Sequence, residues 1–214
     1  YNDCVKLKVK GNRVLLEKIG WVKTNEPLPV DCKYYNPRIK FDGKYWYLTV
    51  GIEVETEKSV LDGRIVGVDV GIRELAVTSD GVFYENINKT ASVRKVEKRL
   101  KRLQRRASKK YKKGTLKSKH LLKLEGKIRK HHRRLVNIRT NHVHQATAEI
   151  VKSKPFRIVM ETLNIRGMMK DKHLAKAVAN QKLYFFKQCL QYKCELHGIE
   201  FVEADQWFPS SKLC

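Results

Sequence analysis

Apolar and polar residues alternate with a period of two in the first third of the chain. Four short strands are predicted from this alternation, at residues 5–9, 14–17, 39–41 and 45–50. The last two flank Asp42-Gly43, a dipeptide typical of tight hairpin turns. Short strands, close turns and few helix formers predict a partial β-barrel over residues 1–62. A β-module that serves only as a scaffold remains the alternative.

A second group of three strands follows, joined by turns short enough for antiparallel pairing. These strands are predicted at residues 64–71, 75–78 and 82–84. The first of them is apolar at successive positions, which is typical of a central strand covered on both faces.

The hydrophobic period then changes to that of a helix, over residues 90–152. Val93, Val96 and Leu100 recur at spacings of three and four, and the same pattern resumes from Leu121 after a Gly-containing break. Two such stripes separated by a short turn predict an antiparallel helical hairpin inserted into the fold.

An α/β pattern returns after the hairpin. Residues 157–160 form a short apolar run that ends in Glu161, and residues 174–197 have the period of one helix. Gly198 is well placed to cap that helix, and residues 199–203 are predicted to form another strand. The predicted fold class is therefore α/β, with a mixed sheet and helices packed on it.

Charge changes the interpretation of the hairpin. The chain has 46 Lys and Arg against 22 Asp and Glu, a net charge of +24, and residues 89–139 hold 22 of the basic residues with only two acids. Charge runs usually mark solvated helix faces, but such faces mix signs. One sign at this density favours phosphate contacts. The candidate nucleic-acid-binding residues are Arg94, Lys98, Arg102, Arg105, Arg106, Lys109, Lys112, Lys113, Lys123, Lys127, Arg133 and Arg134.

The remaining composition restricts the setting of the protein. No run of about 18 apolar residues could span a bilayer, and no signal-peptide pattern is present, so no membrane partner is expected. Five irregularly spaced cysteines favour a reducing, cytoplasmic location, nucleoid-associated in a prokaryote. The chain begins without Met and stops at Ser-Ser-Lys-Leu-Cys, and we expect it to be a fragment.

Two carboxylates have a setting that suggests chemistry. Asp69 lies within an apolar strand and Glu161 ends another, so each should face a low-dielectric core unless it meets a cation. If the two strands are neighbours, the carboxylates converge, and converging oxygen ligands suit Mg²⁺ or Mn²⁺. Two such ions can activate water for phosphodiester hydrolysis. The alternative is that Asp69 bonds a nearby turn and Glu161 caps the next helix.

Aromatic residues are weaker candidates. Trp46, Trp207 and Phe208 could stack on bases, but packing in a core is the favoured interpretation. No glycine-rich phosphate-binding loop is present.

Three segments resemble motifs of the TnpB proteins, transposon-encoded endonucleases long known as OrfB transposases. Residues 67–81, GVDVGIRELAVTSDG, resemble the first RuvC motif, and residues 158–168, IVMETLNIRGM, resemble the second. Residues 207–214, WFPSSKLC, are similar to the segment that leads into a zinc ribbon. The resemblance covers residues 63–214, residues 1–62 fit the family's wedge barrel more loosely, and type V CRISPR effectors share the plan.

This resemblance implies an RNase H-like (RuvC) nuclease domain over residues 63–214 and a wedge-like domain over residues 1–62. It also implies an RNA-guided DNA endonuclease with a guide RNA and target DNA as partners. Asp69 and Glu161 would be catalytic and would bind Mg²⁺ or Mn²⁺ at a two-metal site. Cys214 would be a zinc ligand in the intact protein, whose remaining zinc ligands and third catalytic acid have no counterpart here.

We therefore expect RNA-guided, metal-dependent DNA cleavage by the intact protein and little or none by this chain alone. The alternatives are a guide-RNA- or DNA-binding regulator that no longer cuts, and a DNA transposase. Asp205 could substitute for the absent acid, although no motif matches it.

Overall fold

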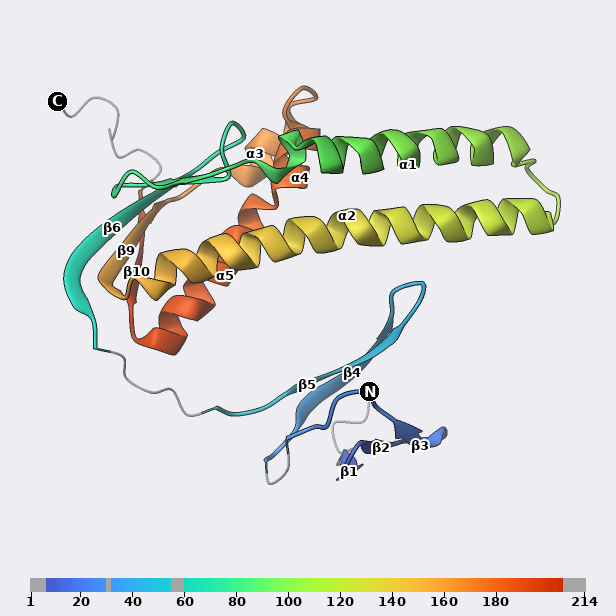
Figure 1. Ribbon diagram of the computed structural model, residues 1–214, viewed down its shortest axis with the longest axis horizontal. Coiled ribbons are helices and arrows are strands. Elements are labelled where there is room, and N and C mark those ends of the chain that lie inside the picture. The colour runs from blue at the N-terminus through green and yellow to red at the C-terminus, as the bar shows by residue number, and fades with distance from the viewer. Residues whose placement is uncertain (1–6, 30–31, 55–59, 206–214) are drawn as a thin grey trace. The chain divides into compact units, whose positions relative to one another are not determined.

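A computed structural model describes residues 7–29, 32–54 and 60–205 of the chain (Figure 1). The chain divides into two compact units, Tyr1–Glu55 and Thr56–Cys214.

The first unit contains two small antiparallel sheets. One has the order β1 (Lys8–Lys10), β2 (Arg13–Leu16), β3 (Gly20–Lys23), and the other pairs β4 (Tyr35–Phe41) with β5 (Trp46–Gly51). The predicted hairpin turn is confirmed, because the Asp42 carboxylate accepts hydrogen bonds from the backbone of Lys44 and Tyr45 at 2.8 and 2.9 Å. No strand pairing joins the two sheets in the described residues, so the partial β-barrel stays a prediction.

Trp46 is not a core residue. Its side chain is 72% exposed and lies against Phe41, with 4.8 Å between the ring centroids. The prediction that Trp46 packs in a core is therefore wrong. A two-stranded ribbon has too few neighbours to cover an aromatic side chain. Trp207 and Phe208 lie outside the described residues.

The second unit is built on a five-stranded mixed sheet in the order β10-β9-β6-β7-β8. Its strands are β6 (Asp62–Val70), β7 (Ala76–Thr78), β8 (Phe83–Tyr84), β9 (Pro155–Glu161) and β10 (Glu200–Ala204). β6, β7 and β8 are antiparallel neighbours, whereas β9 runs parallel to both β6 and β10. The predicted mixed sheet is confirmed, with β6 at its centre.

The predicted helical hairpin is also confirmed. After a short 3₁₀ helix, η1 (Ile87–Lys89), α1 (Ala91–Lys110) and α2 (Lys119–Lys152) run side by side. Thr90 and Ser118 cap their N-termini by accepting backbone hydrogen bonds from Val93 and Leu121. Each cap fixes the N-terminus of its helix just before the apolar stripe begins.

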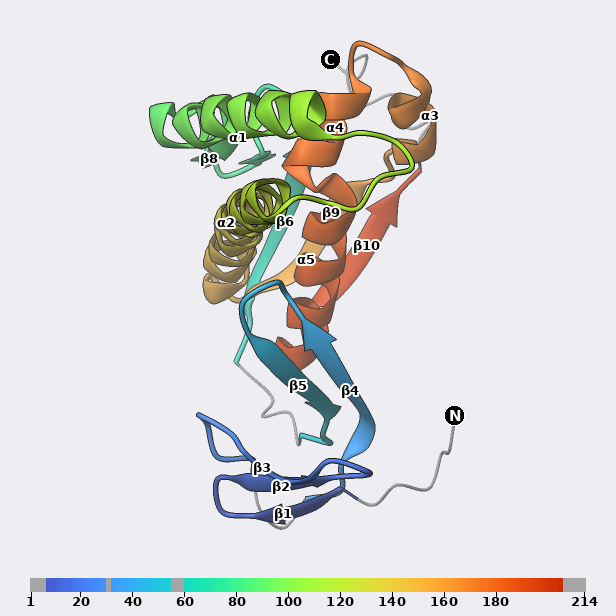
Figure 2. The same cartoon turned by 90° about the vertical axis from the view of Figure 1, so that its right-hand side faces the viewer.

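The C-terminal half of α2 and the helix α5 (Leu183–His197) cover one face of the sheet (Figures 1 and 2). Val66, Val68 and Ile158 from the strands and Phe186 and Leu190 from α5 are each at most 3% exposed. Alternation along a strand places Val66, Val68 and Val70 on this covered face.

One helix was predicted over residues 174–197, but the structure has two, α4 (Ala175–Gln181) and α5, in addition to α3 (Ile165–Lys170). Lys182 separates them in the left-handed region, with φ of 57°. Its ammonium donates to Thr140 Oγ1 at 2.7 Å, and neighbouring Gln181 bonds the loop after β6. These contacts with residues distant in sequence stabilise the break between α4 and α5, and the local sequence around Lys182 does not predict it. Gly198 caps α5 with φ of 70°, as predicted.

The opposite face of the sheet is open in the part of the chain that the structure describes. Ile65 on β6 is 56% exposed and Phe83 on β8 is 67% exposed. The prediction that β6 is covered on both faces is therefore not met by the described residues. Among the helices described, none has the length and apolar character needed to cross a bilayer.

Candidate functional site

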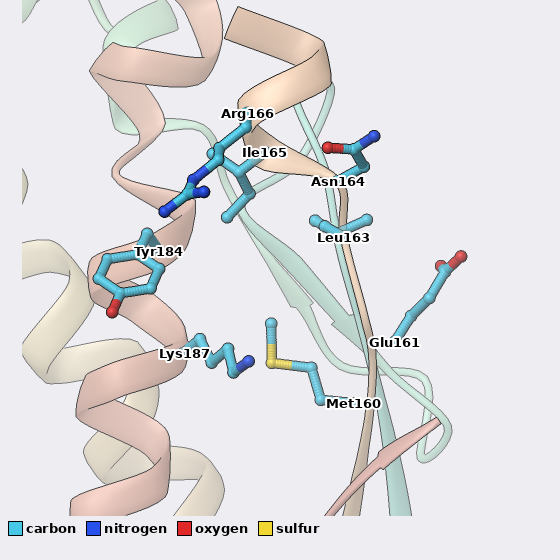
Figure 3. Close-up of a pocket in the computed structure, with 8 residues that line it drawn as sticks. All are labelled: Met160, Glu161, Leu163, Asn164, Ile165, Arg166, Tyr184 and Lys187. Carbon is cyan, nitrogen blue, oxygen red and sulfur yellow. The ribbon is translucent and has the colours of Figure 1, made fainter. Parts of the chain in front are cut away.

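Asp69 and Glu161 lie at neighbouring positions of neighbouring strands. β6 and β9 are parallel, and their register pairs Val68 with Met160, one residue before each acid. Because Val68 and Met160 face the helices, alternation sends both carboxylates to the opposite, open face. Figure 3 shows Glu161 and Met160 on opposite sides of the β9 backbone. The two strands are thus neighbours, which is the condition on which the expected convergence depends.

The expectation that these acids face the low-dielectric core is wrong. Both side chains are exposed, because the helices cover only the other face of the sheet. Glu161 does not cap the next helix either, since Asn164 Oδ1 accepts from the Gly167 N–H at 2.9 Å and caps α3. Neither the Asp69 nor the Glu161 side chain has an ion pair or hydrogen bond with another described residue. Their oxygens are available to a ligand.

The donor set fits a hard divalent cation. Mg²⁺ is typically held by one or two carboxylates and completes its shell with water and substrate phosphate oxygens. Asp69 and Glu161 supply two such carboxylates at one end of the sheet. Within residues 7–29, 32–54 and 60–205 no third Asp, Glu, His or Cys joins them to make a larger cluster. Cys214, the candidate zinc ligand, lies outside the described residues.

The loop that follows Asp69 is anchored by a buried amide. Gln181 is 3% exposed, and its Nε2 donates to the carbonyl oxygens of Gly71 at 3.1 Å and Glu74 at 3.4 Å. The side chain of Asn86 donates to the Ile72 carbonyl in the same loop at 2.7 Å. Gln181 therefore fixes the backbone two residues beyond Asp69.

A chain of hydrogen bonds connects this anchor to the base of the hairpin. Asn88 Nδ2 donates to Gln181 Oε1 at 3.1 Å, and Arg139 Nε donates to Asn88 Oδ1 at 2.7 Å. Arg139 also pairs with Glu97 at 2.7 Å, and its side chain is only 12% exposed. Arg139 thus joins α1 to α2 and is a structural cation. Arg139 is one of the 22 basic residues between positions 89 and 139, and its charge is already paired within the hairpin.

The other charges of the hairpin face solvent. Of the twelve candidate nucleic-acid-binding residues eleven are exposed and Arg133 is half-buried. Glu125, the second acid of the hairpin, pairs with Lys117 at 2.7 Å. The hairpin therefore offers a long cationic surface, as a polyanion partner requires. The exposed candidates are Arg94, Lys98, Arg102, Arg105, Arg106, Lys109, Lys112, Lys113, Lys123, Lys127 and Arg134.

A second polar cluster lies between α2 and α5. The ring of His144 packs edge-on against Phe185, with 5.4 Å between centroids, and its Nδ1 is 3.7 Å from Cys189 Sγ. Lys193 donates to the His144 carbonyl at 2.6 Å. Burial, reinforced by the ammonium groups of Lys193 and Lys182, lowers the pKa of His144. A neutral imidazole at neutral pH suits this packed position.

Comparison with known proteins agrees with this architecture. The chain is 29% identical over 90% of its length to a "Putative RNA-guided DNA endonuclease" of Streptomyces pristinaespiralis, of which it covers 46%. It is 32% identical over 80% of its length to InsQ of Escherichia coli K12, which has the same description, and covers 41% of it. The chain thus spans less than half the length of these relatives.

A solved structure supports the fold. A Cas12f1 chain, from a complex with sgRNA and target DNA, superposes with a TM-score of 0.51 at 19% identity. The match covers 82% of this chain and 36% of that one. Residues 49–172, more than half of the chain, match the family OrfB_IS605, described as "Probable transposase". The chain therefore belongs to the OrfB_IS605 family, the TnpB proteins whose motifs its sequence resembles.

Proposed function

We propose that the protein containing this chain is an RNA-guided, metal-dependent DNA endonuclease with an RNase H-like (RuvC) nuclease domain. The observation that carries this proposal is the placement of Asp69 and Glu161 at the ends of adjacent parallel strands, exposed and without partners in the described residues. The mixed sheet and the names of the relatives support the same assignment.

Asp69 and Glu161 would hold Mg²⁺ or Mn²⁺ at a two-metal site. Such ions polarise a phosphoryl oxygen and lower the pKa of bound water, which supplies the nucleophile. The residues of this chain would fix the geometry: Gln181 holds the loop after Asp69, and Asn164 caps the helix that follows Glu161. Rigid positioning of this kind lowers the cost of organising the reactive groups.

The basic hairpin would contact the phosphates of a guide RNA and of target DNA. The two acids within residues 89–139, Glu97 and Glu125, are already paired with Arg139 and Lys117, so a phosphate backbone meets little repulsion along this part of the hairpin. Sequence recognition would come from base pairing with the guide RNA, whereas the protein would hold the backbone.

This chain alone should cleave weakly or not at all. The described residues gather two carboxylates at the site, and no third ligand completes them. Cys214 would contribute to a structural zinc site only with ligands from the longer protein, since one thiolate does not hold zinc.

The direct test is cleavage by the full-length protein with its guide RNA and Mg²⁺. Asp69→Asn should abolish cleavage while guide RNA binding is kept. The control is Asp80→Asn, which changes an exposed carboxylate in the β7–β8 turn of the same sheet. Cleavage that persists in Asp69→Asn would contradict the catalytic assignment.

Two other functions use the same scaffold. The family's description as a transposase favours strand transfer, for which joined DNA products would be diagnostic. A regulator that only binds a guide RNA or DNA would give neither cut nor joined products, whatever residue stands at position 69.

A further inference from the structure

A cavity lies on the helix side of the strand that carries Glu161. It has a volume of about 260 Å³ and lies between the end of β9, α3 and α5. Met160, Leu163 and Ile165 give it an apolar lining, and Arg166, Tyr184 and Lys187 reach it from the two helices (Figure 3). Glu161 of the proposed metal site also borders this cavity, but the apolar lining, Tyr184 and Arg166 have no role in that site.

Its polar groups are suited to a flat, negatively charged ligand. Tyr184 lies in the first turn of α5, directly after the break at Lys182, and is 60% exposed. Arg166 is exposed, and it makes no ion pair with the residues that the structure describes. Lys187 is partly balanced by Glu203, whose carboxylate lies 2.5 Å from its Nζ. Arg166 is therefore the cation available to a ligand.

An exposed aromatic ring beside a free guanidinium is the pattern that holds single-stranded nucleic acid. The ring stacks on a base, and the guanidinium binds phosphate oxygens in a bidentate manner. The bases of an intact duplex are already stacked on one another, so they cannot enter such a site.

The backbone geometry links this cavity to the two acids. Met160 faces the cavity and Glu161, the next residue, projects over the other face of the sheet, as consecutive strand residues must. A nucleotide seated against Met160 would therefore lie beside Glu161, which also lines the cavity. The cavity and the acids therefore meet at one strand end, where Glu161 itself borders the cavity.

The position of Arg166 is fixed locally. Asn164 caps α3 by accepting from the Gly167 N–H, and a Cβ atom on residue 167 would lie 2.7 Å from the Asn164 side chain. Only glycine permits this cap, so the Asn164–Gly167 pair sets the turn from which Arg166 reaches the cavity.

We propose that this cavity holds one nucleotide of the DNA single strand to be cut, with Tyr184 stacked on its base and Arg166 on its phosphate. Both are positioning residues for the scissile phosphodiester. This inference rests on the proposed nuclease function, and it adds a subsite that holds the substrate strand.

The test is photo-crosslinking of the full chain to single-stranded DNA that carries 5-iodouracil, with a chelator present so that no cleavage occurs. The adduct should map to Tyr184 and persist in Tyr184→Phe. It should fall by about fivefold or more in Tyr184→Leu, the range expected when a base stack is removed. Arg166→Gln should also reduce the yield.

The matched control is Tyr192→Leu, which changes a second exposed tyrosine of α5 away from the cavity. It should leave the adduct unchanged, and thermal unfolding should show that each variant folds. An adduct that survives Tyr184→Leu, or that forms with single-stranded RNA but not DNA, would overturn the proposal.

The assay separates this inference from the nuclease proposal. An adduct at Tyr184 in an Asp69→Asn background would support the subsite even if the full-length protein does not cleave DNA. Conversely, cleavage that depends on Asp69 without any adduct at Tyr184 would contradict the proposed subsite and leave the nuclease proposal intact.

Discussion

The sheet and the helical hairpin of the second unit are stabilised in different ways. The sheet buries a broad apolar cluster, in which Ile158, Phe186 and Leu190 have no exposed surface. The hairpin has only a narrow seam between its two helices, in which Val93, Val96, Leu100 and Leu135 form a small buried cluster. The stability of the sheet should therefore follow from packing, and that of the hairpin from its charges and their partners.

Polar groups show the same contrast. Near the sheet, Gln181 and Thr147 are almost fully buried and each is hydrogen-bonded. On the hairpin, most basic side chains face water and repel one another. One region is organised before any ligand arrives, whereas the other is organised to receive a polyanion.

The largest expected effect is on the apolar cluster. Phe186→Ala should lower the free energy of unfolding by about 3–5 kcal/mol, because it removes a fully buried ring and leaves a cavity. Urea unfolding followed by circular dichroism measures this. Phe83→Ala, at a position 67% exposed, should change stability by no more than about 0.5 kcal/mol. Equal losses at both positions would refute the assignment of the core.

The amide that anchors the loop after Asp69 comes next. Gln181→Leu should lower the free energy of unfolding by about 1–3 kcal/mol, because it leaves the carbonyls of Gly71 and Glu74 without this donor. The matched control is Gln104→Leu, at an exposed position of α1. Hydrogen exchange of the amides in residues 71–75 should rise in the first variant and not in the second.

Two helical glycines should respond with opposite signs. Gly126→Ala should stabilise the chain by about 1 kcal/mol, because a Cβ meets nothing within 4 Å and helix propensity improves. Gly167→Ala should destabilise it, since the new Cβ would collide with the Asn164 cap. Thermal unfolding of the two variants gives both signs, and stabilisation by both would contradict the packing of α3.

Nucleic-acid binding by the hairpin should depend steeply on salt. Replacing Arg105 and Arg106 with Gln should reduce the slope of log affinity against log salt by about 0.9 for each duplex-DNA phosphate that these side chains neutralise. Arg73→Gln, an exposed site outside the hairpin, should leave the slope unchanged. An unchanged slope in the double variant would mean that this face of the hairpin is only solvated.

The smallest expected effect concerns pH. Burial lowers the pKa of His144 below its usual 6.5, and the Lys193 and Lys182 ammonium groups act in the same direction. The unfolded chain therefore binds a proton more readily, so stability should fall as the pH drops below about 6.5 toward the folded-state pKa. His144→Gln should flatten this part of the pH profile of unfolding. An unchanged profile would show that His144 is not the titrating group.

Much of this architecture follows from local patterns in the sequence. The three-four spacing of Val93, Val96 and Leu100 predicted the hairpin, and Gly198 predicted the end of α5. The apolar runs around Asp69 and before Glu161 predicted two strands of the sheet. The expected convergence of the two carboxylates required these strands to be neighbours, and they are. These features depend on periodicity and caps, which short segments encode.

Other features depend on contacts between distant segments. The break at Lys182 and the roles of Gln181 and Arg139 arise from partners 42 to 110 residues away in the chain. The exposure of Asp69 depends on which face of the sheet the helices cover, and its own strand does not encode that choice. Tertiary contacts determine these features, so local sequence propensity does not predict them.

The central claim is that Asp69 and Glu161 share a divalent cation. Mn²⁺ binding to the chain, followed by electron paramagnetic resonance, tests it without any need for cleavage. We predict that Asp69→Asn and Glu161→Gln each weaken Mn²⁺ binding, and that Asp80→Asn leaves it unchanged. Equal Mn²⁺ affinity in all three variants would contradict the claim and would leave the two acids as surface residues at the end of a sheet.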